Sequence, residues 1–314
     1  MARKPRIHYP GAFYHVILRG NCRQDIFLAN DDRYRFYFFL QEGIERYRHV
    51  IHAFCLMTNH VHLLVQVDDV PLSRIMQNIS FRYTRWFNWK HGKSGHLFQG
   101  RFKAVVVDSD EYLIELVRYL HLNPVKAGLA KDPQDYPWSS HRCYVGKEEI
   151  PWVTTDSTLS SFGKRKNVAR KKFHQFVMEG VDEGYRPEFH GLASKDSRML
   201  GDESFMESAL AHNEETPIRA VNMDELVAAV CRYYQISTEE LKGRMHHYSH
   251  ARAMAAWIAL ETAGCTMTEL AKAVDRDVST LSSRAKRLQL GAREDARLLA
   301  EWNAIREEIA RVQA

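Results

Sequence analysis

Residues 51–67 read IHAFCLMTNHVHLLVQV. The apolar run that ends this stretch is rich in Val and Leu, which is typical of a β-strand. Side chains alternate between the two faces of a strand, so His60 and His62 should point the same way while Val61 faces the other side. Two imidazoles on one face can hold a divalent metal, which would suggest chemistry on an oxygen-rich substrate such as a phosphodiester. Alone, the motif also fits two histidines that are simply hydrogen-bonded.

The composition is that of a globular protein with room for two domains: 314 residues, 45% hydrophobic and 26% charged. No apolar run reaches the roughly 18 residues that a membrane helix needs, and no hydrophobic segment follows the basic N-terminus. We therefore expect a protein that is neither membrane-bound nor secreted. The five cysteines show no CxxC spacing, which argues against a zinc site or a disulfide framework and favours a cytoplasmic location.

The charge distribution leans toward a polyanionic partner. The formal net charge is +5, and residues 163–172 hold six basic side chains and no acid. This basic run fits either a solvated linker or helix face, or a contact with a phosphate backbone.

The first 146 residues alternate strand and helix signals. Strands are expected at 13–19, in the two runs on either side of 57–59, and at 104–107; helices are expected at 33–47, 71–87 and 109–124. The order β-α-β-β-α-β-α matches a ferredoxin-like α+β domain, an antiparallel sheet with helices, over residues 1–146.

The rest of the chain is predicted to be helical. Residues 147–221 are expected to form a connecting, partly helical basic segment without its own core. Residues 222–314 are expected to form an all-helical domain, with helices near 223–235, 237–243, 249–263, 266–274, 278–289 and 292–312.

A second group of polar residues lies on the third predicted helix. Tyr119 and Asn123 are four residues apart, so they share one face of that helix. If the helix packs on the sheet, this face could meet His60 and His62. Asn123 could then supply a third metal ligand through its amide oxygen, and Tyr119 could attack a phosphate polarised by the metal. Taken singly, Tyr119 fits helix packing and Asn123 fits a helix end.

The motifs together resemble a known family. Residues 57–64 closely resemble the His-hydrophobic-His (HUH) motif of single-tyrosine transposases, and residues 119–128 resemble their tyrosine helix. Further matches occur at residues 11–16, 19–21, 95–102 and 138–140. Over roughly residues 6–145 the chain is therefore similar to the REP-associated tyrosine transposases.

This resemblance implies an HUH nuclease that binds Mg²⁺ or Mn²⁺ through His60 and His62. Tyr119 would be the catalytic nucleophile that becomes joined to a DNA 5′-phosphate. Asn123 stands where related insertion-sequence transposases carry a Gln metal ligand; the amide oxygen is kept on a shorter side chain.

The substrate implied by the resemblance is single-stranded DNA folded into a REP-like hairpin. Arg and Lys can pair with phosphates, and aromatic rings can stack on unpaired bases. The stacking candidates are Tyr83, Trp86 and Phe98. The expected DNA contacts in this region are Arg19, Asn21, Arg82, Arg85, Arg101, Lys103 and Lys126.

The C-terminal region has the pattern of a helix-turn-helix. Thr266 and Glu269 form a predicted capping box, and a second, basic helix follows that opens with Ser and Thr. On pattern alone a helical dimerisation bundle remains open. The stretch is similar to the DNA-binding domain of the replication initiator DnaA, which implies duplex DNA contacts by Arg252, Asp277, Ser279 and Thr280. Val278 replaces the histidine usual there, so the initiator's own recognition sequence is not expected.

The leading hypothesis is a metal-dependent DNA strand transferase that cuts and rejoins single-stranded DNA at hairpin-forming repeats. The alternative is a catalytically silent, sequence-specific DNA-binding regulator that grips hairpins. A rolling-circle nickase shares the motif, but the sequence has no GxxxxGK[ST] loop of an attached helicase. The sequence leaves open whether the protein is a monomer or a homodimer.

Overall fold

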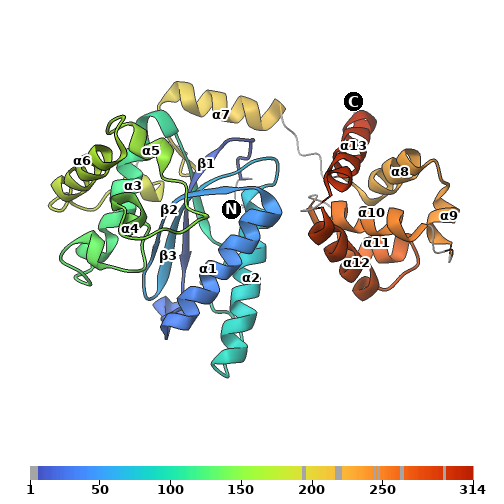
Figure 1. The fold of residues 1–314 in the computed structure, drawn as a ribbon, viewed down its shortest axis with the longest axis horizontal. Coiled ribbons are helices and arrows are strands. Elements are labelled where there is room, and N and C mark those ends of the chain that lie inside the picture. Colours follow the sequence, from blue (N-terminus) through green and yellow to red (C-terminus); the bar gives the residue numbers. More distant parts are fainter. Residues whose placement is uncertain are drawn as a thin grey trace. The chain divides into compact units, whose positions relative to one another are not determined.

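The computed structural model describes residues 6–192, 196–215, 221–243, 245, 248–261, 265–292 and 295–313. The chain divides into two compact units, Met1–Thr216 and Pro217–Ala314. Figure 1 shows a sheet with helices in the first unit and helices in the second. Among the described helices, none is both long and apolar enough to cross a membrane.

The first unit is built on a five-stranded sheet with the order β2-β3-β1-β4-β5. β1 pairs antiparallel with both β3 and β4, and β2 pairs antiparallel with β3. The order of the first four strands is that of a ferredoxin-like fold, as the sequence predicted. The strands are β1 (Phe13–Arg19), β2 (Val50–Leu56), β3 (His60–Gln66), β4 (Lys103–Val107) and β5 (Met199–Leu200).

Helices cover both faces of this sheet (Figure 1). α1 (Asn30–Tyr47) and α2 (Leu72–Lys90) pack on one face, over a core that includes Val16, Val61 and Leu63. α3 (Ser109–Lys126) packs on the other face, over a core that includes Leu64 and Val105. The alternation of side chains along β1 and β3 therefore separates two cores, and the sheet lies between them.

α3 runs one turn beyond its predicted end at Asn123-Pro124. Pro124 has no backbone N–H and leaves the Leu120 carbonyl without its usual helical donor. The Asn123 side-chain nitrogen donates to this carbonyl at 3.4 Å and to the Tyr119 carbonyl at 2.8 Å. These bonds compensate for the proline, so the helix continues to Lys126.

Residues 147–215 belong to the first unit and do not stand between two domains. α6 packs against α3, and Phe173, Val177 and Phe189 are buried in the core under that helix. β5 adds a parallel edge strand to β4. The expected boundary at 146 is therefore wrong, because apolar residues spread thinly through a polar segment still complete the core of the sheet. The elements of this region are α4 (His141–Val145), α5 (Asp156–Ser160), α6 (Lys166–Glu179), η3 (Pro187–His190) and α7 (Glu203–Glu215), with η1 (Asn21–Arg23) and η2 (Pro133–Asp135) earlier in the chain.

The second unit has a helical core of its own. Met254, Ile258 and Leu270 are fully buried in it, together with Leu281 and Ile305. Its predicted helices are present within about two residues in most cases; the predicted end of one of them, 262–263, lies outside the described residues. The helices are α8 (Met223–Tyr234), α9 (Thr238–Lys242), α10 (Ser249–Glu261), α11 (Met267–Ala273), α12 (Val278–Gly291) and α13 (Ala296–Gln313).

Candidate active site

His60 and His62 lie on the α3 face of the sheet, and Val61 is buried on the opposite face. Their ring centroids are 4.9 Å apart. On the neighbouring strand Arg19 stands opposite His60 and Ile17 stands opposite His62. Side chains directly opposite in an antiparallel pair share a face, so β1 brings Arg19 to the histidines.

A hydrogen-bonded chain fixes the ring of His62. His15 Nδ1 lies 2.8 Å from the Phe189 carbonyl oxygen, and His15 Nε2 lies 2.9 Å from His62 Nδ1. Since a carbonyl only accepts, His15 carries its hydrogen on Nδ1, and its bare Nε2 accepts from His62 Nδ1–H. This assignment leaves a lone pair on His62 Nε2, which is the atom that a metal would use.

Asn59 orients His60 in the same way. Its side-chain oxygen lies 2.6 Å from His60 Nδ1, while its side-chain nitrogen donates to the Arg23 carbonyl at 3.2 Å. His60 Nδ1–H is therefore the donor to Asn59, and His60 Nε2 is left bare. Both histidines present the same type of nitrogen lone pair.

The surroundings keep these histidines neutral. Burial, with the nearby Arg19 and His190, lowers the pKa of His60 to about 4. Burial, with His15 and His60, holds the pKa of His62 well below its usual value. Burial also lowers the pKa of His15 to about 3. Neutral imidazoles bind metal ions, whereas imidazolium does not.

α3 presents Tyr119 to this face. The Tyr119 ring centroid lies 6.0 Å from that of His62 and 6.1 Å from that of His15. Its side chain is 8% exposed, and burial, the largest cause, with other nearby groups raises its pKa to about 12. Asn123 follows one turn later, and both of its bonds to the helix use the amide nitrogen. The amide oxygen is therefore the atom suited to a cation.

His190 joins the site from a region that sequence reasoning treated as a connector. Tyr119 Oη lies 2.7 Å from His190 Nε2, and the Tyr185 ring stacks on His190 with centroids 5.1 Å apart. Burial, reinforced by Lys103 and Arg19, lowers the pKa of His190. The sequence carries no local signal for this residue. His15 could have been found, because two-residue alternation places it with Arg19 on one face of β1.

The expected DNA contacts of the first unit fall into two groups. Lys103 opens β4 on the same face as His62, since it stands opposite Ile17. Lys126 places Nζ 5.9 Å from the Tyr119 ring centroid. Asn21 begins η1 shortly after β1, and Arg101 precedes β4; both are exposed.

Arg82 and Arg85 lie elsewhere, on α2, which covers the opposite face of the sheet. Arg82 forms an ion pair with Glu42 and lies over the Phe39 ring. Two of the predicted stacking residues are also used internally: Tyr83 is fully buried and donates to the Ile26 carbonyl, and Phe98 is buried. The structure therefore does not bring these four residues to the histidine face. Residue type alone could not separate the two faces of the sheet.

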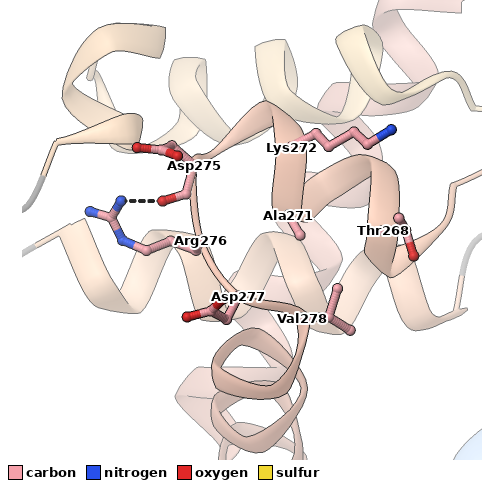
Figure 2. A pocket seen from close by; sticks show the side chains of 7 residues that line it. All are labelled: Thr268, Ala271, Lys272, Asp275, Arg276, Asp277 and Val278. Atoms are coloured by element: carbon pink, nitrogen blue, oxygen red, sulfur yellow. Dashed lines mark hydrogen bonds between the residues drawn. The ribbon is translucent and has the colours of Figure 1, made fainter.

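The second unit contains two consecutive helices, α11 and α12, where the sequence predicted a helix-turn-helix. Thr266 caps α11, with its hydroxyl and backbone N–H bonded to the Glu269 carboxylate. A short turn then leads into α12. Asp277, Ser279 and Thr280 are exposed at this point. Figure 2 shows Asp277 and Val278 at the edge of a shallow hollow, across from Ala271 and Thr268.

Arg252 is not placed as a free DNA contact. Its side chain is 4% exposed and donates to the carbonyl oxygens of Leu241, Gly243 and Met245 at 2.9, 2.8 and 3.2 Å. These bonds link α10 to the last turn of α9 and to the residues that follow it. The prediction that Arg252 contacts DNA is therefore replaced by a structural role, because the guanidinium is already occupied.

Comparisons with known proteins agree with the motifs. Residues 9–123 match the family model described as Transposase IS200 like. A protein of Haemophilus influenzae named as a REP-associated tyrosine transposase is 32% identical over 124 residues, which span 35% of this chain and 69% of that relative. A solved structure titled as a REP-associated tyrosine transposase bound to a REP hairpin is 21% identical, with a TM-score of 0.40, over 52% of this chain and 98% of that one. From the identity and coverage of the Haemophilus relative, the chain belongs to the family of REP-associated tyrosine transposases.

Proposed function

We propose that the protein is a metal-dependent strand transferase that cleaves and rejoins single-stranded DNA at REP-like hairpins through a covalent 5′-phosphotyrosine. The observation that carries this proposal is that three groups lie together. They are Tyr119 on α3, the neutral histidines of β3 with a lone pair on each Nε2, and His190, which can accept the proton of Tyr119. Membership of the family of REP-associated tyrosine transposases supports the substrate class.

The donor set fits a divalent ion. His60 Nε2 and His62 Nε2 would bind it, with Asn123 Oδ1 as the third ligand. Bound there, the ion would supply a Lewis acid for a phosphate oxygen. Of the two expected ions, Mn²⁺ accepts imidazole nitrogen more readily than Mg²⁺, which prefers oxygen.

A side chain of the protein can accept the phenolic proton of Tyr119. With the His190 hydrogen on Nδ1, Tyr119 Oη–H donates to His190 Nε2. As Tyr119 Oη forms its bond to phosphorus, His190 takes the phenolic proton. The bond from phosphorus to the 3′-oxygen breaks, and that oxygen takes a proton from solvent water and leaves as a 3′-hydroxyl. His190 releases its proton to solvent, so no net proton is gained or lost. The reverse reaction rejoins the strand.

Cations at the edge of the site would hold the DNA backbone. We assign this role to Arg19, Lys103 and Lys126, with Arg101 and Asn21 as outer contacts. For the second unit we propose duplex DNA binding by Asp277, Ser279 and Thr280 at the start of α12, supported by the capped helix-turn-helix geometry.

Replacement of the nucleophile tests the proposal. With Mn²⁺ and a hairpin oligonucleotide, Tyr119→Phe should form no denaturant-resistant protein–DNA adduct and should bind the hairpin nearly as tightly as the wild type. Tyr34→Phe, at an exposed tyrosine on α1, is the matched control and should keep the adduct.

Two results would change the assignment. An adduct formed by Tyr119→Phe would exclude Tyr119 as the nucleophile. Failure of the wild-type protein to cleave with either metal, while it still binds hairpins, would favour the alternative function of a silent DNA-binding regulator.

A further inference from the structure

A second group of histidines lies in the first unit, outside the site described above. His121 and His141 are fully buried, and His174 and Asp132 lie at the edge of the group with side chains 28% and 22% exposed. They come from α3, α4, α6 and the residue that caps η2. One potential ligand atom each from Asp132, His141 and His174 lies within 4.8 Å of the others.

The hydrogen bonds of this group can be followed from its buried end. Ser140 Oγ donates to the Phe54 carbonyl at 3.3 Å and accepts from the Phe54 N–H at 2.9 Å. His121 Nε2 lies 2.8 Å from Ser140 Oγ, and His121 Nδ1 lies 3.2 Å from His141 Nδ1. If the Ser140 hydroxyl donates to Phe54, then His121 Nε2–H donates to Ser140 Oγ, His141 Nδ1–H donates to His121 Nδ1, and a lone pair is left on His141 Nε2.

That lone pair points at His174. His141 Nε2 lies 3.1 Å from His174 Nδ1, and His174 Nε2 lies 3.5 Å from Asp132 Oδ2. A neutral His174 has one ring hydrogen. If that hydrogen lies on His174 Nδ1 and is donated to His141, the lone pair on His174 Nε2 faces the Asp132 carboxylate, which is repulsive. In this assignment a positive charge at this end, as a metal ion or as an imidazolium, removes the conflict. In the reverse assignment every bond runs outward from the Ser140 hydroxyl, and the rings are neutral.

The spacing of the three groups fits a metal ion. Two nitrogens bound to a tetrahedral Zn²⁺ at about 2.0–2.1 Å lie about 3.3 Å apart, close to the observed spacing of His141 and His174. Burial lowers the pKa of His141 to about 3, so its nitrogen stays available as a ligand. The contact of His141 with His121 is the outer bond that metal-binding histidines commonly make.

We propose that Asp132, His141 and His174 form a Zn²⁺ site, with water in the fourth position at the exposed edge. The site uses no cysteine. The lack of CxxC spacing, which argued against a zinc site, therefore applies only to sites built from cysteine. The ion would link α6 to α4 and to the start of η2. The group also includes His121 on α3, two residues after Tyr119, so the ion would also stabilise the position of the helix that carries the nucleophile.

The zinc content of the full-length protein tests this proposal. After removal of metal and titration with Zn²⁺, His174→Ala and Asp132→Asn should each bind one equivalent less than the wild type under the same conditions. Asn at position 132 keeps the oxygen that caps η2, where Asp132 Oδ1 accepts from the Gln134 N–H, so folding is preserved. His96→Ala, at an exposed histidine, is the control and should bind as the wild type does.

The His60 and His62 pair is intact in every variant, so zinc bound there cancels from the comparison. Co²⁺ in place of Zn²⁺ should give the strong visible absorption of a tetrahedral site, and this absorption should be lost in His174→Ala. Equal metal binding by the wild type and both variants would overturn the proposal and leave a hydrogen-bonded chain of histidines.

Discussion

The contact between Tyr119 and His190 gives the proposed nucleophile a neighbouring proton acceptor. A phenol with a pKa of about 12 is almost entirely protonated at neutral pH. An uncharged imidazole 2.7 Å away can take that proton during attack, so no free phenolate is needed beforehand. This contact depends on η3, which lies outside the part of the chain that matches the family model.

Removal of the acceptor should slow the chemistry and spare the binding. We expect His190→Ala to lower the rate of hairpin cleavage about 100-fold, within the usual range for general-base groups. Hairpin affinity should be nearly unchanged, because His190 is not among the cations proposed to bind DNA. Single-turnover cleavage and a separate binding titration measure the two effects. An unchanged cleavage rate would remove His190 from the mechanism.

Tyr185 provides a control for that experiment. Its ring stacks on His190, and its side chain is largely exposed. Tyr185→Phe keeps the stacked ring and should cleave at close to the wild-type rate. If Tyr185→Phe were as slow as His190→Ala, the hydroxyl of Tyr185 would have to be included in the proton path.

At the scale of elements, one buried carboxylate joins the start of α1 to the end of α2. Asp32 accepts from the backbone N–H groups of Leu28 and Ala29 at 2.7 and 2.9 Å. Its other oxygen contacts Lys90 Nζ at 2.9 Å and His91 Nε2 at 3.0 Å. The cross-helix partners of Asp32 became visible only when the two helices were packed.

These contacts set the direction of a pH effect. Burial alone would raise the pKa of Asp32, but the hydrogen bonds from Lys90, His91 and the backbone outweigh it and lower the pKa. The carboxylate therefore stabilises the fold above its unfolded-state pKa of about 3.9, and this contribution is lost as the pH falls through the lower folded-state value.

Asp32→Asn should reduce the free energy of unfolding of the first unit by about 2 kcal/mol at pH 7, because hydrogen bonds to charged groups are lost. The difference from the wild type should shrink as the pH falls below the folded-state pKa. Urea unfolding at pH 7 and in acid measures both values. Asp31→Asn removes an exposed carboxylate 3.7 Å from Lys90 and should cost less than about 1 kcal/mol. A pH-independent loss in Asp32→Asn would contradict this account.

At the scale of the whole molecule, the two units have separate cores. Sheet, histidine face and Tyr119 belong to the first, and the capped α11–α12 pair belongs to the second. Two independent cores would allow the two proposed DNA-binding activities, one for hairpins and one for duplex DNA, to be separated.

The double substitution Ser279→Ala with Thr280→Ala should separate these activities. We expect it to weaken duplex DNA binding about tenfold, since a contact at a base or phosphate is worth about 1–3 kcal/mol. Hairpin cleavage should keep its wild-type rate. Asn303→Ala, an exposed position on α13, should change neither. Duplex binding that is unaffected by the double substitution would exclude the start of α12 as the reading surface.

Much of this protein follows from local sequence. Strand alternation placed His60 and His62 on one face, helical spacing placed Tyr119 and Asn123 on one face, and the Thr266–Glu269 box marked the start of α11, because these patterns repeat within a few residues. The order of strands and helices also predicted the sheet, since few topologies accommodate it.

Only the tertiary structure showed which residues far apart in the sequence come together at the site. Phe189 and His190 reach the site from about 70 residues beyond Tyr119, and they do so because residues 147–215 complete the core instead of linking two domains. Burial likewise assigned Arg252 and Tyr83 to internal bonds. A sequence shows which side chains can bind DNA or metal; packing determines which of them face a partner and which are already satisfied within the fold.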